Sequence, residues 1–147
     1  MISKEHIGRV FAAHTVQVEA GRLRFFAKAI GETDPVYTDV KAAQAAGYRD
    51  LPAPPTFLFC LEMEQDDPLA WLQTIGADLG RILHGEQSFN YYLPVCAGDS
   101  LRFETQISDI YDKKGGALEF VVRKTRVTNQ HGEHVADLSG SVVQRNG

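Results

Sequence analysis

Cysteine is scarce in this chain, which contains only Cys60 and Cys96. Two cysteines do not make a disulfide framework, and their spacing fits no metal-binding motif. Both lie among apolar residues, so we expect buried, inert thiols, because a free cysteine behaves as a small hydrophobe. The sequence also lacks a P-loop, a Gly-x-Gly-x-x-Gly motif and a Cys-x-x-Cys motif, and its histidines are scattered. We therefore expect neither a metal ion nor a cofactor.

Long apolar runs and basic runs are missing as well. No stretch approaches the roughly 20 apolar residues that span a bilayer. The N-terminal residues 1–6 are polar and lack the apolar core of a signal peptide. The formal net charge is −4, with acids and bases interleaved, so no basic surface for nucleic acid is indicated. These absences predict a cytoplasmic protein that binds neither a membrane nor nucleic acid.

The remaining composition is that of an ordinary globular protein, with 44% apolar and 23% charged residues. A length of 147 residues lies near the commonest domain size, so we expect residues 1–147 to form one domain around one core. The class of fold then follows from how the apolar residues repeat along the chain.

Helical spacing dominates the first half of the chain. We first expect a strand at residues 11–18, in which alternate residues share one face: Phe11, Ala13, Thr15 and Gln17. A helix follows at residues 23–30, where apolar residues form one stripe: Leu23, Phe26, Ala27 and Ile30. Gly31 ends this helix, and a second helix at residues 39–46 has Thr38 as its expected N-cap.

A stiff, proline-rich segment leads into the most apolar part of the chain. Residues 50–55 hold three prolines and predict an extended connection. Thr56 is the expected N-cap of a helix at residues 57–63 that is apolar nearly all round, which is typical of a buried helix. Asp67 and the proline after it predict the start of one more short helix at residues 69–75.

From residue 81 onward the apolar period changes to two. Four runs predict strands: residues 82–92, 101–111, 117–128 and 134–144. The turns between them have breaker composition: residues 94–99, 112–116 and 129–132. Long antiparallel strands with one apolar face need a cover, and the helix at residues 57–63 is the obvious candidate. The sequence therefore predicts an α+β fold of about five strands wrapped around a buried helix.

The one site-like feature is the turn at residues 31–37. It places two carboxylates, Glu32 and Asp34, beside Pro35, which pushes Asp34 out of helical dihedrals. From composition alone, both carboxylates are read as turn formers or helix caps.

The order of motifs along the chain adds a second interpretation. Four residues of the turn region fall on the signature Gly-Asp-x-Asn-Pro-(aliphatic)-His, followed six residues on by Ala or Ser: Gly31, Pro35, Val36 and Ala43. Residues 46–48, 83–87 and 94–101 match further short motifs in the same order. Over residues 7–143 the chain resembles the MaoC-like dehydratases and (R)-specific enoyl-CoA hydratases, and within them the N-terminal half of the MaoC-like dehydratases.

The resemblance implies a hotdog fold, in which an antiparallel sheet curls around a central helix. Such domains pair side by side and bind acyl thioesters of CoA or of an acyl carrier protein at the seam. In active members the signature Asp and His activate water and move protons at C2 and C3. A backbone N–H near the start of the central helix holds the thioester oxygen, on which negative charge builds up.

The chain departs from this pattern at the catalytic positions. Glu32 stands where the family has Asp, Asp34 where it has Asn, and Tyr37 where it has His. Tyrosine cannot replace histidine as a base, because its ordinary pKa is about 10. The family's His-Gly pair aligns with Pro55 and Thr56, and Pro55 has no N–H to offer. Glu32, Asp34 and Tyr37 are thus candidate catalytic positions with incomplete acid–base machinery.

Four residues are candidates for substrate binding: Pro55, Thr56, Phe57 and His84. For His84 the competing interpretation is a half-buried strand histidine that a neighbour satisfies. Trp71 belongs to an apolar helix face, for which core or partner contact is favoured over an acyl pocket.

Several hypotheses remain open. The first is the half of a two-hotdog hydratase or dehydratase that lacks the catalytic His and needs a chain with the intact Asp/His signature. The second is a self-sufficient homodimeric lyase that uses Glu32 with Tyr37 or His84. The others are a module that binds acyl thioesters without chemistry and a thioesterase, since fold alone does not decide function. The sequence leaves open the acyl chain, its carrier and the direction of reaction.

Overall fold

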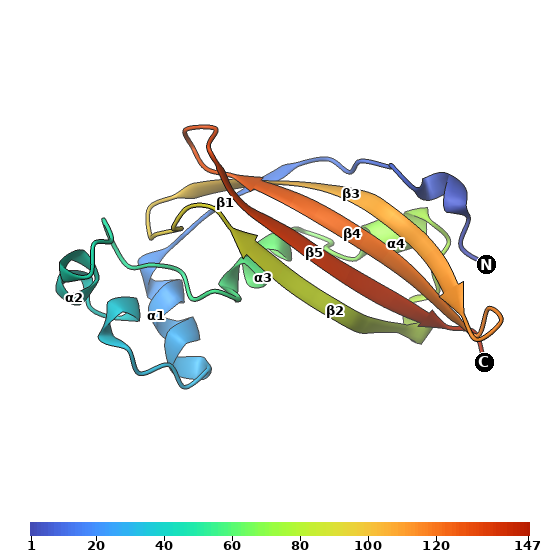
Figure 1. The fold of residues 1–147 in the computed structure, drawn as a ribbon, viewed down its shortest axis with the longest axis horizontal. Helices are drawn as coiled ribbons and strands as arrows, with labels where there is room; N and C mark the ends of the chain where they lie inside the picture. Colours follow the sequence, from blue (N-terminus) through green and yellow to red (C-terminus); the bar gives the residue numbers. More distant parts are fainter.

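A computed structural model describes residues 1–147 and shows one five-stranded sheet (Figure 1). The strands are β1 (His14–Gln17), β2 (Ile82–Tyr91), β3 (Ser100–Lys113), β4 (Leu118–Thr128) and β5 (His134–Arg145). Their order is β1-β3-β4-β5-β2, and every neighbouring pair is antiparallel. The four strands expected from the period of two are therefore confirmed, and β1 and β2 form the two edges.

The helices are short, and the four α-helices occupy two places. They are η1 (Lys4–His6), α1 (Ala20–Ala29), η2 (Pro35–Tyr37), α2 (Val40–Ala45), α3 (Phe57–Glu62), α4 (Ala70–Thr74) and η3 (Leu79–Arg81). In the view of Figure 1, α3 and α4 lie behind the sheet, whereas α1 and α2 project beyond one of its ends. None of these helices combines the length and apolar character that a bilayer crossing demands.

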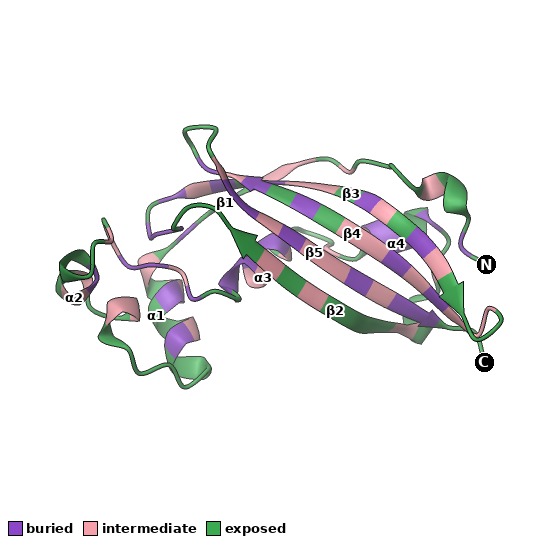
Figure 2. Cartoon of the chain, viewed as in Figure 1, coloured by how far each residue is buried: buried purple, intermediate pink, exposed green.

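The core lies between the sheet and the helices behind it. Leu58 and Leu61 of α3 are fully buried and belong to one cluster with Phe103 and Val127 of the sheet. Burying one such leucine contributes about 1.5–3 kcal/mol. Figure 2 shows the matching alternation of buried and exposed residues along the strands. The predicted antiparallel sheet on a buried helix is confirmed.

A second cluster lies under α4. It contains Trp71, Leu72 and Ile75, packed against Ile107 and Val121 of the sheet. The expectation that Trp71 is a core residue is confirmed, because it is 8% exposed. The cysteines agree in part with the expectation, since Cys96 is buried and Cys60 is only partly covered.

The first strand is shorter than predicted. Only residues 14–17 pair with β3. Thr15 and Gln17 share a face as expected, and it is the exposed one, because Val16 and Val18 are buried. Residues before His14 reach β3 through single contacts, such as the Phe11 N–H to the Thr105 carbonyl at 3.0 Å. The ladder is interrupted there, so the alternation does not continue from Phe11.

Two helix caps also differ from the predictions. Asp39, not Thr38, caps α2, since its Oδ1 accepts the Lys41 N–H at 2.9 Å. Thr56 precedes α3 but its side chain caps nothing. The start of α2 is therefore fixed by a local hydrogen bond one residue later than expected, and the start of α3 has no side-chain cap.

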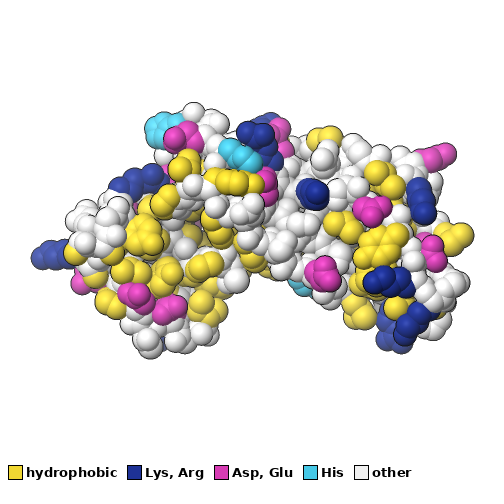
Figure 3. All heavy atoms as spheres, in the orientation of Figure 1, with side chains coloured by type: hydrophobic (Ala, Val, Ile, Leu, Met, Phe, Trp, Pro, Cys, Tyr) yellow, Lys and Arg dark blue, Asp and Glu magenta, His cyan; other side chains and the backbone are white.

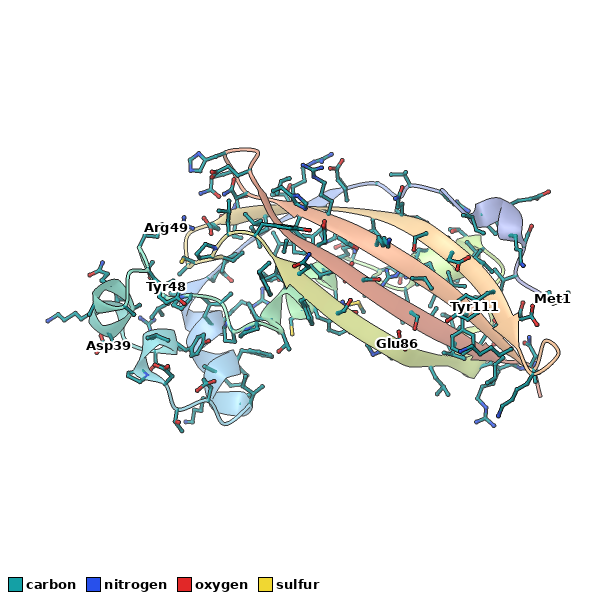
Figure 4. All side chains as sticks on the ribbon, in the orientation of Figure 1. Met1, Asp39, Tyr48, Arg49, Glu86 and Tyr111 are labelled. Carbon is teal, nitrogen blue, oxygen red and sulfur yellow. The ribbon has the colours of Figure 1, made fainter.

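Asp99 holds the turn between β2 and β3 in place. It is 1% exposed, and its carboxylate accepts the Cys96 N–H at 2.9 Å and the Gln130 side-chain amide at 3.0 Å. Arg49, which lies at the end of the sheet from which α2 projects (Figure 4), forms an ion pair with the same carboxylate. One buried charge therefore ties together three segments that are distant in sequence.

We expect Asp99→Ala to lower the free energy of unfolding by about 2–4 kcal/mol, because it leaves buried donors and a cation without their acceptor. Urea unfolding followed by circular dichroism measures this. Asp112→Ala is the matched control, since Asp112 is exposed. Equal effects of the two substitutions would contradict the role given to Asp99.

Candidate functional site

A cleft of about 340 Å³ lies where η2, the segment before α3 and the end of β2 meet. Its lining is mainly apolar and aromatic: Tyr37, Tyr48, Pro52, Ala53, Pro55, Tyr91, Tyr92, Leu93, Pro94 and Val95. Figure 3 shows hydrophobic side chains gathered over this end of the molecule, and Figure 4 places Tyr48 there. The cleft has the shape and lining of a site for an apolar ligand with few polar anchors.

Tyr91 closes one wall of the cleft. Its hydroxyl donates a hydrogen bond to the Pro55 carbonyl, which joins the end of β2 to the segment that enters α3. Although Tyr91 is 36% exposed, burial around the hydroxyl raises its pKa. The tyrosine therefore stays protonated and positions Pro55 at neutral pH.

Tyr37 comes from η2 and is half-buried. Asp34 begins η2, because its Oδ1 accepts the Val36 N–H at 3.0 Å. The pKa of Tyr37 is raised, first by burial and then by the negative charge of Glu32. A tyrosine with a raised pKa can donate a hydrogen bond at neutral pH but cannot act as a base.

Glu32 is exposed and engaged with its own turn. Its Oε1 accepts the N–H groups of Thr33 at 2.8 Å and of Asp34 at 3.0 Å. Neither Glu32 nor Asp34 lines the cleft. Both carboxylates thus hold the turn that carries Tyr37.

The remaining candidate residues are spread along α3 and β2. Phe57 is 3% exposed and packs on Phe26, with ring centroids 4.9 Å apart, so its side chain belongs to the core. Thr56 is exposed, and its N–H donates to no acceptor within the chain. His84 is also exposed and lies seven residues before Tyr91 on β2, about 23 Å away at the rise of a strand. The structure brings Tyr37 and Pro55 together and leaves His84 elsewhere.

Three tyrosines of the cleft were not among the predicted site residues: Tyr48, Tyr91 and Tyr92. The available signal was the aromatic pair at 91–92 just where the expected strand runs into Pro94. No group of three histidine, cysteine or acidic residues is placed to hold a metal ion. No histidine lines the cleft either.

Comparison with known proteins identifies the class. In solved structures, the chain is similar to the HadBC (3R-hydroxyacyl-ACP dehydratase) complex of Mycobacterium tuberculosis, with 26% identity and a TM-score of 0.80 over 93% of this chain and 96% of that one. A MaoC-like dehydratase superposes with a TM-score of 0.85 at 23% identity, over 95% of this chain and 42% of that one. The predicted α+β hotdog fold is confirmed.

The family follows from sequence. The model of the FAS1-like, dehydratase domain region matches residues 5–138. A UPF0336 protein of Saccharopolyspora erythraea is 36% identical over 98% of this chain and 92% of its own length, and one of Streptomyces avermitilis is 36% identical over 98% and 95%. The chain belongs to the FAS1-like dehydratase family, which confirms the resemblance to the MaoC-like dehydratases; the assignment to their N-terminal half stays a prediction.

We expect Tyr91→Phe to lower the free energy of unfolding at pH 7 by about 1 kcal/mol, because the bond to Pro55 is lost. Above pH 10 the difference in the free energy of unfolding between Tyr91→Phe and the unmodified protein should become smaller. In this pH range Tyr91 ionises in the unfolded chain but stays protonated in the folded chain, where its pKa is raised. Ionisation therefore stabilises the unfolded state of the unmodified protein and lowers its free energy of unfolding, whereas the phenylalanine variant has no such group.

Chemical unfolding at pH 7 and pH 11 checks both parts. Tyr111→Phe is the matched control, because the Tyr111 hydroxyl has no hydrogen-bond partner and its ring stacks on Phe120. A difference for Tyr91→Phe that is unchanged by pH would show that its hydroxyl is not buried against Pro55.

Proposed function

We propose that this chain is one subunit of a 3-hydroxyacyl-thioester dehydratase or enoyl-thioester hydratase, and that it is the half without the catalytic histidine. The proposal rests mainly on the position and protonation state of Tyr37. It occupies the position of the family's histidine, lines the cleft and has a raised pKa. A group that stays protonated at neutral pH cannot take a proton from water.

The other acid–base candidate does not replace that histidine. Adding water to an enoyl thioester needs one group that accepts a proton and one that donates it, both within hydrogen-bond reach of the reacting atoms. The Glu32 carboxylate is turned to the N–H groups of Thr33 and Asp34, outside the cleft. The proton transfers are therefore assigned to a partner chain with the intact Asp/His signature.

This chain supplies binding surface to the shared site. The tyrosines of the cleft offer aromatic contact surface for an apolar chain. The Thr56 N–H, which has no acceptor within the chain, lies next to Pro55 at the cleft wall. A fixed N–H donor stabilises the negative charge that develops on a thioester oxygen, so Thr56 is the candidate for that contact.

The edge strand β2 is the proposed partner surface. Only β5 pairs with it, so its other side presents unpaired backbone groups, which form a template for another strand. Large exposed apolar residues lie on it or directly after it: Leu83, Tyr91, Tyr92 and Leu93. Two solved structures similar to this chain are complexes of two hotdog chains, HadBC and ChsH1-ChsH2 of Mycobacterium tuberculosis. A second hotdog chain is accordingly the partner we propose, with CoA or a carrier protein bearing the acyl group.

Association through β2 can be tested by native mass spectrometry of this chain co-expressed with a MaoC-like chain that has the intact signature. We expect a complex, and we expect Leu83→Glu to weaken it at least tenfold, because a charge would be buried in the seam. Val10→Glu is the control, since Val10 is 65% exposed near the opposite edge of the sheet. Equal binding by both variants would exclude β2 as the interface.

If the partner chain carries out the proton transfers, substitutions in the two chains should affect the hydration of a trans-2-enoyl-CoA by that complex differently. Glu32→Gln in this chain should leave kcat within about threefold, because the carboxylate holds a turn. Alanine in place of the partner's signature histidine should lower kcat by about 100-fold or more. Loss of turnover on Glu32→Gln, with the complex intact by mass, would instead assign the chemistry to this chain.

A further inference from the structure

A second cavity, of about 240 Å³, lies at the other end of α3 and β2. Its walls are mostly apolar and come from six elements: Phe59 of α3, Trp71 of α4 and Leu79 of η3 face residues of β2, β4 and β5. His84 of β2 is exposed at its rim. One charged side chain, Arg123 of β4, lines this apolar space.

The Arg123 side chain has no hydrogen bond or ion pair within the chain, although the sequence provides 19 acidic residues. Its guanidinium lies over the Trp71 ring, 4.3 Å from the centroid. Burial lowers its pKa, and the side chain is only partly exposed. A guanidinium carries five N–H donors, so a partly buried one without acceptors is a binding group with free capacity.

Trp71 lies beneath the guanidinium and contributes its ring to the cavity wall. Its Nε1 is buried without a hydrogen bond and has almost no accessible surface, so an occupant of the cavity does not reach it. Apart from His84 at the rim, Arg123 is the polar group of an apolar cavity, and its preferred occupant is apolar with an oxygen acceptor at one end.

Glu62 is the nearest source of opposite charge. It is 4% exposed and raises the pKa of Arg123, opposing the effect of burial. Its carboxylate, however, accepts from the Thr125 hydroxyl, forms no ion pair with Arg123 and does not line the cavity. Glu62 therefore balances the charge of the guanidinium without using its donors.

The place of the cavity connects it with the proposed subunit role. Two hotdog chains that pair along β2 about a two-fold axis perpendicular to the sheet align the strands antiparallel. The Ile82 end of β2, where this cavity lies, then adjoins the Tyr91 end of the partner's corresponding strand, where the partner has its thioester cleft. An acyl chain held at the partner's catalytic residues is directed toward this cavity.

We propose that this cavity receives the far end of the acyl chain and selects chains that carry an oxygen there, as a carboxylate or hydroxyl, through Arg123. The proposal rests on the proposed function, which it extends to the class of acyl group. Arg123 is a specificity residue in it and takes no part in the proton transfers.

The purified chain tests this directly, because Trp71 is its only tryptophan and reports on the cavity by fluorescence. Three probes share one chain and differ at the far end: methyl octanoate, methyl omega-hydroxyoctanoate and monomethyl octanedioate. We expect monomethyl octanedioate to bind about tenfold more tightly than methyl octanoate, the gain of a charge-assisted hydrogen bond. If methyl omega-hydroxyoctanoate binds most tightly of the three, the cavity recognises a neutral oxygen. Equal affinity for all three probes, or no binding of any of them, overturns the proposal.

Substitutions in β4 test whether Arg123 causes the preference for the probe with a terminal carboxylate. Arg123→Met keeps an apolar stem and should bring the three affinities within about twofold, whereas Arg126→Met, at an exposed position of the same strand, should leave the preference unchanged. Arg123→Gln provides a second variant that keeps a donor and loses the charge, so the carboxylate preference should fall in it too. A preference that survives both substitutions at Arg123 overturns the proposal.

The outcomes separate this proposal from the proposed function. Absence of a complex with a MaoC-like partner would leave probe binding by the single chain unchanged. Absence of the oxygen preference would leave hydration of an unsubstituted enoyl-CoA by the complex unchanged.

Discussion

The packing of α3 against the antiparallel sheet is the contact on which the other features of the molecule depend. Leu58 and Leu61 are fully buried beneath it, and together they contribute several kcal/mol by their burial. The start of α3 then fixes Pro55 and Thr56 at the aromatic cleft, and its end forms a wall of the second cavity. Because α3 has only six residues, both sites lie close to the same core cluster.

The cleft combines a preserved shape with altered chemistry. The turn that carries Tyr37 is held by Glu32 and Asp34 through hydrogen bonds to backbone N–H groups. The carboxylates therefore serve the geometry of this turn, and Tyr37 is the side chain that the turn presents to the cleft. Under the function proposed above, this chain shapes and binds, and the proton transfers belong to a partner that joins at β2.

Much of the fold could be predicted from sequence because one-sided strands have a period of two, and β3, β4 and β5 show it clearly. The caps and the first strand could not, because Asp39 competes with Thr38 for the same helix start and β1 is set by its pairing with β3. Of the site residues predicted from the sequence, Tyr37 and Pro55 line the cleft. Tyr48, Tyr91 and Arg123 gain their roles from segments distant in sequence, which no local pattern reveals.

The rate at which the purified chain, without any partner, adds water to a trans-2-enoyl-CoA decides most directly whether this chain needs a partner for catalysis. The reaction is followed by the loss of enoyl absorbance over a range of protein concentrations. We predict a rate equal to that of the uncatalysed reaction at every concentration, because no group in the cleft can accept the proton from water. Turnover that rises with protein concentration and disappears on Glu32→Gln would contradict it.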